Sequence, residues 1–538
     1  MTAQRISRAD FYGAATILLI LSLTLKALGV VQQALLAYLF GASGELDAYL
    51  VSVSVPNIVI NMLTAGSLSL AFIPLFSDYY ARGDEDRAWH IASSLGNATV
   101  VIALVIIGVG ALAADPIVTA LAPGFDAGTH GLAVSLLIVQ LPMVGLASVS
   151  AMVKSVLYFF RRFFLPNLAY LFGSLTLLGT VGLLHRQMGV YAVAWGAVLG
   201  AVVALAVQLV ALRGIQPRYR LMLDLHEAGV WRTGGLMLGM TLAVVAVQVN
   251  IMVDRLFASY LPEGSVSVLE YAADFDKLIV STFALSAATA AFPALSDLVA
   301  LGRRGEYAAR LRTTLLTVAM TVLPLAAAAL AVREPIIRVV LQRGRFGPEQ
   351  TAAVAQALLY LMPALVAWAL LYVALYAFFA RREVWWPVAI LAGGVGLNAA
   401  LDALLGPAWG VPGLTLGTSL AGWTACLLIW GLLLRRIDGL ELRSLGRDLL
   451  KITAGAAVAA LVCWLVAAGL DSSLGDGGLL AQGASLGVAL GTGALAYGGV
   501  VLALRLDEAQ QLLRWIGHRL RLSTRVAGSD DLSHLIED

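Results

Sequence analysis

Long apolar runs follow one another along almost the whole chain, separated by short polar loops. A helix needs about 20 largely apolar residues to cross the hydrocarbon core of a bilayer, and the chain contains fourteen such runs. They fall at residues 11–40, 47–79, 88–114, 130–158, 164–185, 188–212, 233–258, 266–300, 308–331, 351–380, 384–405, 412–434, 449–470 and 480–504. The pattern predicts an all-α integral membrane protein with about fourteen transmembrane helices.

The chain also repeats itself, because motifs of its first half recur in its second half in the same order. Pro74 corresponds to Pro293 and Pro116 to Pro335, at one and the same offset in sequence number. The segment YFFRRFFLP after the fourth run corresponds to AFFARREVWWP after the tenth, at nearly that offset. Because each repeat holds an even number of spans, both halves keep one orientation, and their pseudo-twofold axis is expected along the membrane normal.

The repeat predicts two tandem six-helix lobes around a central cavity, followed by two further helices. The expected boundaries are an N-lobe at 1–215, a cytoplasmic interfacial linker at 216–232, a C-lobe at 233–436, helices thirteen and fourteen at 437–505, and an amphipathic cytoplasmic tail at 506–538. The linker, QPRYRLMLDLHEAGVWR, is predicted to be a short amphipathic helix in the membrane interface.

Composition places this chain in lipid. Hydrophobic residues make up 60% and charged residues 13%, whereas a soluble domain carries about 25% charged residues. Arginine pairs such as Arg161/Arg162 and Arg381/Arg382 lie in alternate loops, which predicts a multi-pass protein of the bacterial cytoplasmic (inner) membrane with both termini cytoplasmic. The net charge of +2 is spread over many loops, so no nucleic-acid partner is expected. Cys426 and Cys463 lie in apolar runs and are interpreted as packing residues.

One basic cluster breaks this alternation. Its members are Arg333, Arg338, Arg343 and Arg345. They follow the ninth run, on the side where basic residues are otherwise scarce, with Glu334 and Glu349 nearby. Two interpretations stay open: the arginines form ion pairs with these acids, or they meet an acidic substrate on the exit side.

Polar side chains within the spans concentrate on the first, second, seventh and eighth. An ionisable residue in a span is costly and usually faces a cavity or a partner. The candidates for a substrate cavity are Lys26, Gln32, Asn57, Asn61, Asp254, Glu270, Asp274 and Lys277. Glu270, Asp274 and Lys277 share one helical face because they are four and three residues apart. An alternative for Asp254 and Arg255 is that they extend outward to the headgroups, and Lys154 and Asp402 are interpreted as structural.

The sequence has no P-loop and no HExxH motif, and its six histidines are scattered. We therefore expect a transporter rather than an enzyme, with no cofactor and no metal site. Without a nucleotide site, transport would be driven by the membrane potential, by H⁺ or Na⁺, or by the gradient of the substrate.

Several segments carry a family likeness. They are KALGVVQQALLAYLFGASGELDAY and VPNIVINMLTAGSLSLAFIPLFSDY in the first half, and FASYLPEGSVSVLEYA, AFPALS and LQRGRFGPEQT in the second. Their order and spacing from about residue 15 to 435 resemble the MurJ/MviN family of lipid II flippases, in the multidrug/oligosaccharidyl-lipid/polysaccharide exporter superfamily. The resemblance implies translocation of a peptidoglycan precursor by alternating access, and a role in cell wall biogenesis and cell shape. The two helices beyond the twelfth also fit this family.

The likeness weakens in the expected cavity, which the family marks with arginines that neutralise the lipid diphosphate. The matching positions here are Lys26, Gln32, Ile60, Asn61 and Asp274, while Asp47 keeps the acidic residue of the family motif. On the four cavity helices, three basic side chains stand against five acidic ones. The resemblance implies that Lys26 is the main anion contact, with Glu270 and Asp274 either pairing with it or titrating during transport.

Three substrate classes therefore stay open: lipid II, another undecaprenyl-linked oligosaccharide, or cationic small molecules moved by a cation-coupled multidrug exporter. A membrane glycosyltransferase is disfavoured by the tandem symmetry. The expected partners are the lipid-linked saccharide and membrane lipids, and the expected state is a monomer.

Overall fold

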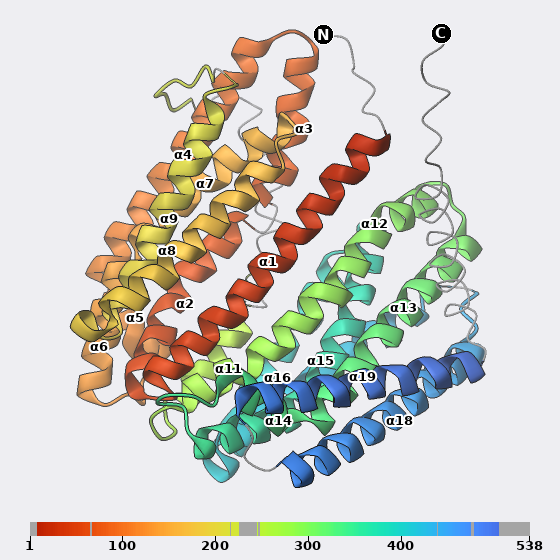
Figure 1. Ribbon diagram of the computed structural model, residues 1–538. Helices are drawn as coiled ribbons and strands as arrows, with labels where there is room; N and C mark the ends of the chain where they lie inside the picture. Colours follow the sequence, from red (N-terminus) through yellow and green to blue (C-terminus); the bar gives the residue numbers. More distant parts are fainter. Residues whose placement is uncertain are drawn as a thin grey trace, which may run out of the picture. The chain divides into compact units, whose positions relative to one another are not determined.

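The computed structural model of the protein describes residues 8–64, 67–215, 217–224, 245, 248–437, 439–474 and 478–504. These residues form helices joined by short turns (Figure 1). The helices are α1 (Arg8–Phe40), α2 (Gly44–Thr64), α3 (Ser67–Ala81), α4 (Glu85–Leu112), α5 (Ala114–Leu121), α6 (Ala127–Gln140), α7 (Pro142–Phe159), α8 (Phe164–Met188), α9 (Tyr191–Leu212), α11 (Ser265–Ile279), η1 (Val280–Ala284), α12 (Leu285–Ala300), α13 (Arg304–Ala331), α14 (Arg333–Leu341), α15 (Pro348–Ala380), α16 (Trp385–Trp409), α17 (Val411–Leu434), α18 (Leu442–Leu474) and α19 (Leu479–Ala503).

Within the described residues, 12 helical segments are long and apolar enough to cross a membrane. They coincide with twelve of the predicted spans, the first, the third to sixth and the eighth to fourteenth. The second predicted span contains α2 and α3, separated by residues 65 and 66, which lie outside the described residues. Of the seventh, at 233–258, only residue 245 and the helical stretch 248–258 are described. The all-α membrane fold is confirmed, and the count of fourteen stays a prediction.

The chain divides into two compact units. Unit 1 comprises Met1–Asp274, Val340–Ala357 and Val388–Ala421, and unit 2 comprises Phe275–Val339, Leu358–Pro387 and Gly422–Asp538. Several helices cross from one unit to the other, among them α15, α16 and α17. The boundaries predicted for the two lobes stay a prediction, and the predicted tail at 506–538 lies outside the described residues.

In unit 1, α8 and α9 pack along their whole length, with α7 beside α9 (Figure 1). Gly173 of α8 meets Gly200 of α9 so closely that a Cβ on Gly173 would lie 2.8 Å from the Gly200 carbonyl oxygen. Small residues of this kind let membrane helices approach to backbone contact.

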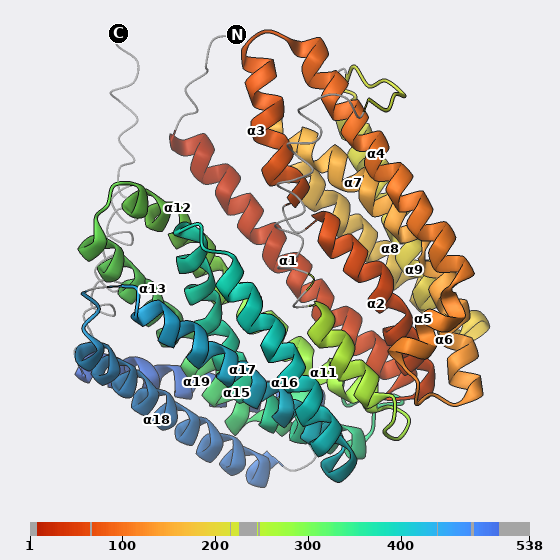
Figure 2. The same cartoon turned by 180° about the vertical axis from the view of Figure 1, so that it is seen from behind.

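In unit 2, α18 packs along both α13 and α19 (Figure 2). The contact is built from small side chains, with Cys463, Ala467 and Ala489 buried against Val332. A Cβ on Gly493 would lie 2.1 Å from the Cys463 sulfur, so α19 comes close to α18 at this point. Cys463 is a free thiol and a packing residue, as predicted.

The sequence repeat is also present in the backbone. Gly83 and Gly302, which are related by the same offset as Pro74 and Pro293, both adopt positive φ, at 81° and 69°. Their amides play the same role in each repeat, donating to the carbonyl oxygens of Tyr80 and Val299. The equivalent arginines Arg161 and Arg382 are the two non-glycine residues with positive φ in the described part of the chain, at 59° and 60°. Turns equivalent in sequence are therefore equivalent in conformation.

The linker prediction is wrong for the described residues 217–224, which contain no helix. Polar side chains of α4 bind the backbone of this segment instead. The Asn97 amide donates to the carbonyl oxygens of Arg220 and Met222 at 3.1 and 2.7 Å, and the Ser93 hydroxyl accepts from the Arg220 amide. Because α4 supplies these partners, the backbone of the linker does not need helical hydrogen bonds of its own.

Candidate functional site

Arg255 is the centre of a buried polar network in unit 1. It comes from the helical stretch 248–258 and is 8% exposed. One terminal nitrogen donates to the Leu50 carbonyl oxygen at 2.7 Å and to the Ser54 hydroxyl, both on α2. The other donates to the Glu270 carboxylate on α11 at 2.6 Å. The guanidinium thus joins three helices, and its charge is balanced by one carboxylate inside the membrane domain.

Asp47 lies close by and caps α11. One carboxylate oxygen accepts from the Gly264 amide and the other from the Ser267 amide, each at 2.7 Å. Asp47 itself lies in the first turn of α2 and is 2% exposed. A carboxylate at these amides satisfies donors that have no helical partner and complements the positive end of the helix. Asp47 is therefore an element that ties α2 to α11, rather than a side chain aimed into an open cavity.

Asp254, next to Arg255 in the chain, belongs to a second buried cluster in unit 1. The Asn398 amide nitrogen donates to one Asp254 oxygen and also to Asp402, at 3.1 Å. The Thr418 hydroxyl lies 3.5 Å from the other Asp254 oxygen. Asn398 and Asp402 are both 0% exposed. Asp254 and Arg255 both point inward, so the alternative in which they extend to the headgroups is wrong.

Two oxygens in this cluster have no hydrogen-bond partner among the described residues: Oδ1 of Asp402 and Oδ1 of Asn398. Gly417 packs against the Oδ1 atom of Asp402: a Cβ on this glycine would lie only 2.6 Å from that oxygen. A glycine at this position leaves room at the carboxylate that any other side chain would fill.

Two carboxylates buried together cannot both stay ionised unless a positive charge joins them. All the groups that face each other here are oxygens of carboxylate, amide and hydroxyl, with one amide nitrogen between them. Oxygen ligands are those that hard cations prefer. The cluster therefore fits either a shared proton or a monovalent cation such as Na⁺.

The other predicted cavity residues occupy more accessible positions. Lys26 and Gln32 are partly buried on α1, Asn57 and Asn61 are exposed on α2, and Asp274 is partly buried on α11. Lys277, in the last turn of α11, is exposed. Of the predicted residues, the described contacts bring Asp47 and Glu270 into one region of unit 1, together with Arg255. The role of Lys26 as the main anion contact stays a prediction.

Three of the four predicted exit-side arginines contact acidic side chains or a backbone carbonyl oxygen. Arg338 lies 3.1 Å from Glu334 and 3.6 Å from Asp471, and Arg333 donates to the Leu330 carbonyl oxygen. Arg345 lies 3.9 Å from Glu45, a long ion pair between exposed side chains. Arg343 is exposed. These contacts favour the interpretation that the arginines form ion pairs with acidic residues. Glu334 is a partner as expected, but the other partners are Asp471 and Glu45 rather than Glu349.

Sequence reasoning missed Asn398 and Thr418, and it interpreted Asp402 as structural. Asn398 and Asp402 are four residues apart within one predicted span, which puts them on one helical face. That spacing was the available signal. Their partner Asp254 lies 144 residues before Asn398 in the chain, and no spacing within one helix can reveal it.

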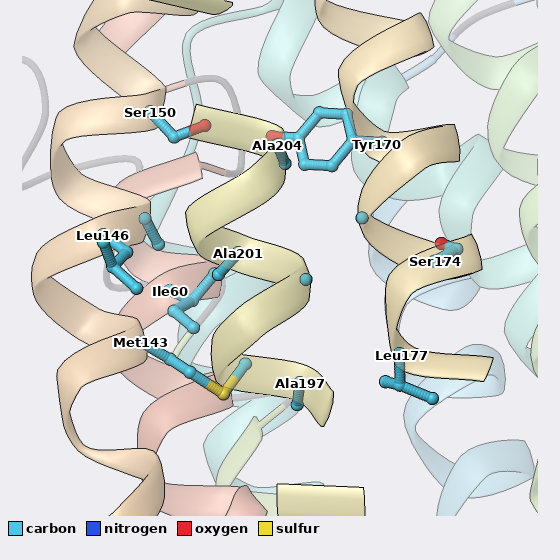
Figure 3. A pocket seen from close by; sticks show the side chains of 13 residues that line it. Ile60, Met143, Leu146, Ser150, Tyr170, Ser174, Leu177, Ala197, Ala201 and Ala204 are labelled. Atoms are coloured by element: carbon cyan, nitrogen blue, oxygen red, sulfur yellow. The ribbon is translucent and has the colours of Figure 1, made fainter. Parts of the chain in front are cut away.

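Unit 1 also contains a largely apolar pocket of about 310 Å³ (Figure 3). Side chains from α7, α8 and α9 line it, together with Ile60 of α2. Ser150 and Tyr170 supply its polar end, where the Ser150 hydroxyl donates to Gln208 at 2.9 Å. Ile60 was placed in the expected cavity by the family likeness, and here it contributes an apolar surface to this pocket.

Many membrane-crossing helices, a duplicated backbone and two buried polar networks define a polytopic membrane transporter. The family model of lipid II flippase MurJ matches residues 36–478, and the chain belongs to this family. The predicted resemblance is thereby confirmed.

Relatives agree with this assignment. The lipid II flippase MurJ of Burkholderia cenocepacia is 26% identical over 413 residues, covering 75% of this chain and 80% of the relative. The probable lipid II flippase MurJ of Rhizobium meliloti is 27% identical over 420 residues, covering 76% and 78%.

Solved structures share the fold. A lipid II flippase MurJ in an inward closed conformation aligns with a TM-score of 0.76 at 22% identity, covering 91% of this chain and 98% of that one. An inward-facing multidrug resistance MATE family transporter of the MOP superfamily aligns with a TM-score of 0.64 at 15% identity, covering 79% and 99%.

Proposed function

We propose that this protein is a flippase that moves lipid II, the lipid-linked peptidoglycan precursor, across the bacterial cytoplasmic membrane by alternating access, with both termini in the cytoplasm. The observation that carries the proposal is the match of the lipid II flippase model over most of the chain. The relatives from two bacteria, whose printed names give the same substrate, support it.

The charge of the Arg255 network fits this function better than the composition alone suggested. Glu270 is paired with Arg255, and Asp47 accepts from the amides at the start of α11. The ion pair cancels one charge of each sign and leaves the difference unchanged, whereas Asp47 is held at the start of α11 and adds no negative charge to an open cavity. Lys26, on α1, remains the proposed contact for the diphosphate of the substrate.

Rescue of bacteria depleted of their own lipid II flippase tests the substrate. We expect the protein to restore growth and Lys26→Arg to retain most of that activity, since charge is what a diphosphate requires. Lys26→Ala should abolish rescue at equal membrane levels. Lys451→Ala is the matched control, because Lys451 lies on α18 and binds the Leu504 carbonyl oxygen. Full rescue by Lys26→Ala would refute the assigned contact, and failure of the unaltered protein would favour another undecaprenyl-linked oligosaccharide.

We further propose that transport is coupled to a monovalent cation, Na⁺ or H⁺, at the cluster of Asp254, Asn398, Asp402 and Thr418. A cation bound only to the folded state stabilises it by about 2.7 kcal/mol at 100 times its Kd. We expect NaCl to raise the melting temperature of the purified protein more than choline chloride does. Asp254→Asn and Asp402→Asn should each abolish that difference.

The control for this experiment is Asp471→Asn, which removes a half-exposed carboxylate from unit 2. A difference between the two salts that survives in both cluster variants would exclude Na⁺ binding at this cluster. A response to pH rather than to Na⁺, lost in the same variants, would instead assign the coupling to H⁺.

A further inference from the structure

A small basic pocket of about 220 Å³ lies at one end of unit 2. Arg304 from the first turn of α13, Arg381 from the turn after α15 and Arg436 from the turn after α17 all line it. Tyr307 lines it as well, is 3% exposed, and donates its hydroxyl to the Ala377 carbonyl oxygen at 2.9 Å. The pocket therefore has a fixed inner wall and three guanidinium groups around it.

Glu383 compensates only part of this charge. One of its oxygens accepts from Arg381 Nε at 3.0 Å and the other from Arg436. In the described part of unit 2, the structure records no second carboxylate for either arginine. The pair of arginines alone thus carries a net charge of +1, and Arg304 also faces the pocket. Such a site favours an anion, because guanidinium groups present N–H donors in a fork that matches a phosphate.

The neighbouring tryptophans indicate the depth of the pocket in the membrane. Trp385 and Trp386 begin α16 and are 77% and 53% exposed. The Arg436 guanidinium carbon lies 5.5 Å from the centre of the Trp386 ring. Exposed tryptophans at a helix end are typical of the headgroup level of a bilayer. The arginine-rich loops also place this end of the helices on the cytoplasmic side under the positive-inside rule.

We propose that this pocket binds the phosphate of an anionic phospholipid of the cytoplasmic leaflet. Basic pockets between membrane helices on this side are suited to acidic lipid headgroups. The first turn of α13 adds to the attraction, since its amides have no side-chain cap and carry the positive end of the helix dipole. This site lies outside the transport networks described above, and the proposal does not depend on which substrate is moved.

The test uses the full-length protein purified in detergent and incubated with phosphatidylglycerol or phosphatidylcholine, with no lipid-linked sugar present. Native mass spectrometry counts the lipid molecules retained. We expect preferential retention of phosphatidylglycerol, and a loss of about tenfold or more in Arg304→Gln/Arg381→Gln, because each hydrogen bond to a charged group contributes that much. The matched control is Arg435→Gln/Arg443→Gln, which removes two exposed arginines that do not line the pocket. It should retain the lipid like the unaltered protein.

A second measurement covers the case in which the double variant folds poorly. Brominated phosphatidylglycerol should quench a part of the tryptophan fluorescence that Trp386→Phe removes, and brominated phosphatidylcholine should not. Equal retention in the double variant and the control would overturn the proposal. The proposal would also be overturned if inorganic phosphate displaced phosphatidylglycerol and bound with the same affinity, since the pocket would then be a site for free phosphate.

Discussion

Two equivalent helix ends, one in each repeat, share a backbone conformation but differ in the side chains around them. The Arg162 amide after α7 donates to the Leu157 carbonyl oxygen, and the Glu383 amide after α15 donates to that of Phe378. Arg161 and Arg382 take the left-handed conformation in between. This is a Schellman motif, in which the left-handed residue lets the last carbonyls of a helix find partners.

Around the first of these ends, aromatic rings fill the space. Phe76, Tyr80, Trp89, Phe159 and Phe160 pack edge-to-face or stacked, with ring centres 4.7 to 6.5 Å apart. Ile215 packs against the same cluster. The region is an apolar core.

Around the second end, polar groups stand at the equivalent positions. Arg381 takes the place of Phe160, and Arg436 takes that of Ile215, both at the offset that relates Arg382 to Arg161. The register is the same in the backbone, since the Ile215 amide donates to Leu212 as that of Arg436 donates to Leu433. The duplicated turn thus gives the backbone the same conformation at both helix ends. The side chains around it form a packed aromatic core at the first end and a basic pocket at the second.

The largest change in the free energy of unfolding is expected in the aromatic cluster around the first helix end. Phe76→Ala should lower the free energy of unfolding by about 3–5 kcal/mol, because the ring is fully buried among other rings. Its counterpart in the second repeat is Leu295, which is equally buried. Leu295→Ala should cost less, because fewer buried atoms are removed. Thermal unfolding in detergent measures both, and a larger loss for Leu295→Ala would show that the aromatic cluster is not the better packed region.

The sequence indicated this duplication through prolines and paired arginines that recur at nearly one offset, and the arginine pairs lie where the backbone turns after α7 and α15. It did not predict the linker, where the mixture of apolar and charged residues favours an amphipathic helix in the membrane interface. The hydrogen-bond partners of residues 217–224 lie on α4, far earlier in the chain. Spacing along the linker itself carries no information about them.

The same reason explains the errors in the site. The pattern on the eighth span placed Glu270 and Asp274 on one face, and the structure pairs Glu270 with Arg255 of the preceding span. Asp254 and Arg255 are adjacent in sequence but enter different networks, one toward Asn398 and one toward α2 and α11. Periodicity identifies which residues face inward. It does not identify which inward-facing residues on different helices meet.

A smaller change in the free energy of unfolding is expected when the polar residue of the first helix end is replaced by its counterpart from the second. Arg162 donates to the carbonyl oxygens of Ala211 and Gly214 at 2.8 and 3.2 Å, whereas Glu383, at its place in the second repeat, accepts from Arg436. Arg162→Glu should lower the free energy of unfolding by about 1–3 kcal/mol, since it faces carbonyl oxygens with a carboxylate and leaves them without a donor.

Adding Ile215→Arg should restore part of that loss, because it recreates the pair of Glu383 and Arg436 in the first repeat. The coupling between neighbouring substitutions in such a cycle is about 0.5–3 kcal/mol. Ile215→Arg alone is the control, and it should destabilise the protein by placing a charge against the aromatic cluster. Strictly additive effects of the two changes would mean that the two helix ends are not interchangeable in this contact.

The smallest effect concerns the backbone that the two ends share. A non-glycine residue in the left-handed conformation costs about 1–2 kcal/mol, and glycine loses about 0.5–1 kcal/mol more entropy on folding than alanine does. Arg161→Gly and Arg382→Gly should therefore each change the free energy of unfolding by less than about 1 kcal/mol, in the stabilising direction. Arg213→Gly is the matched control, because Arg213 also ends a helix but has a φ of −53°, so this substitution should destabilise. Thermal unfolding of the three variants under one condition decides the matter. Opposite signs for Arg161→Gly and Arg382→Gly would mean that the surrounding side chains, aromatic in one repeat and charged in the other, outweigh the conformation that the repeats have in common.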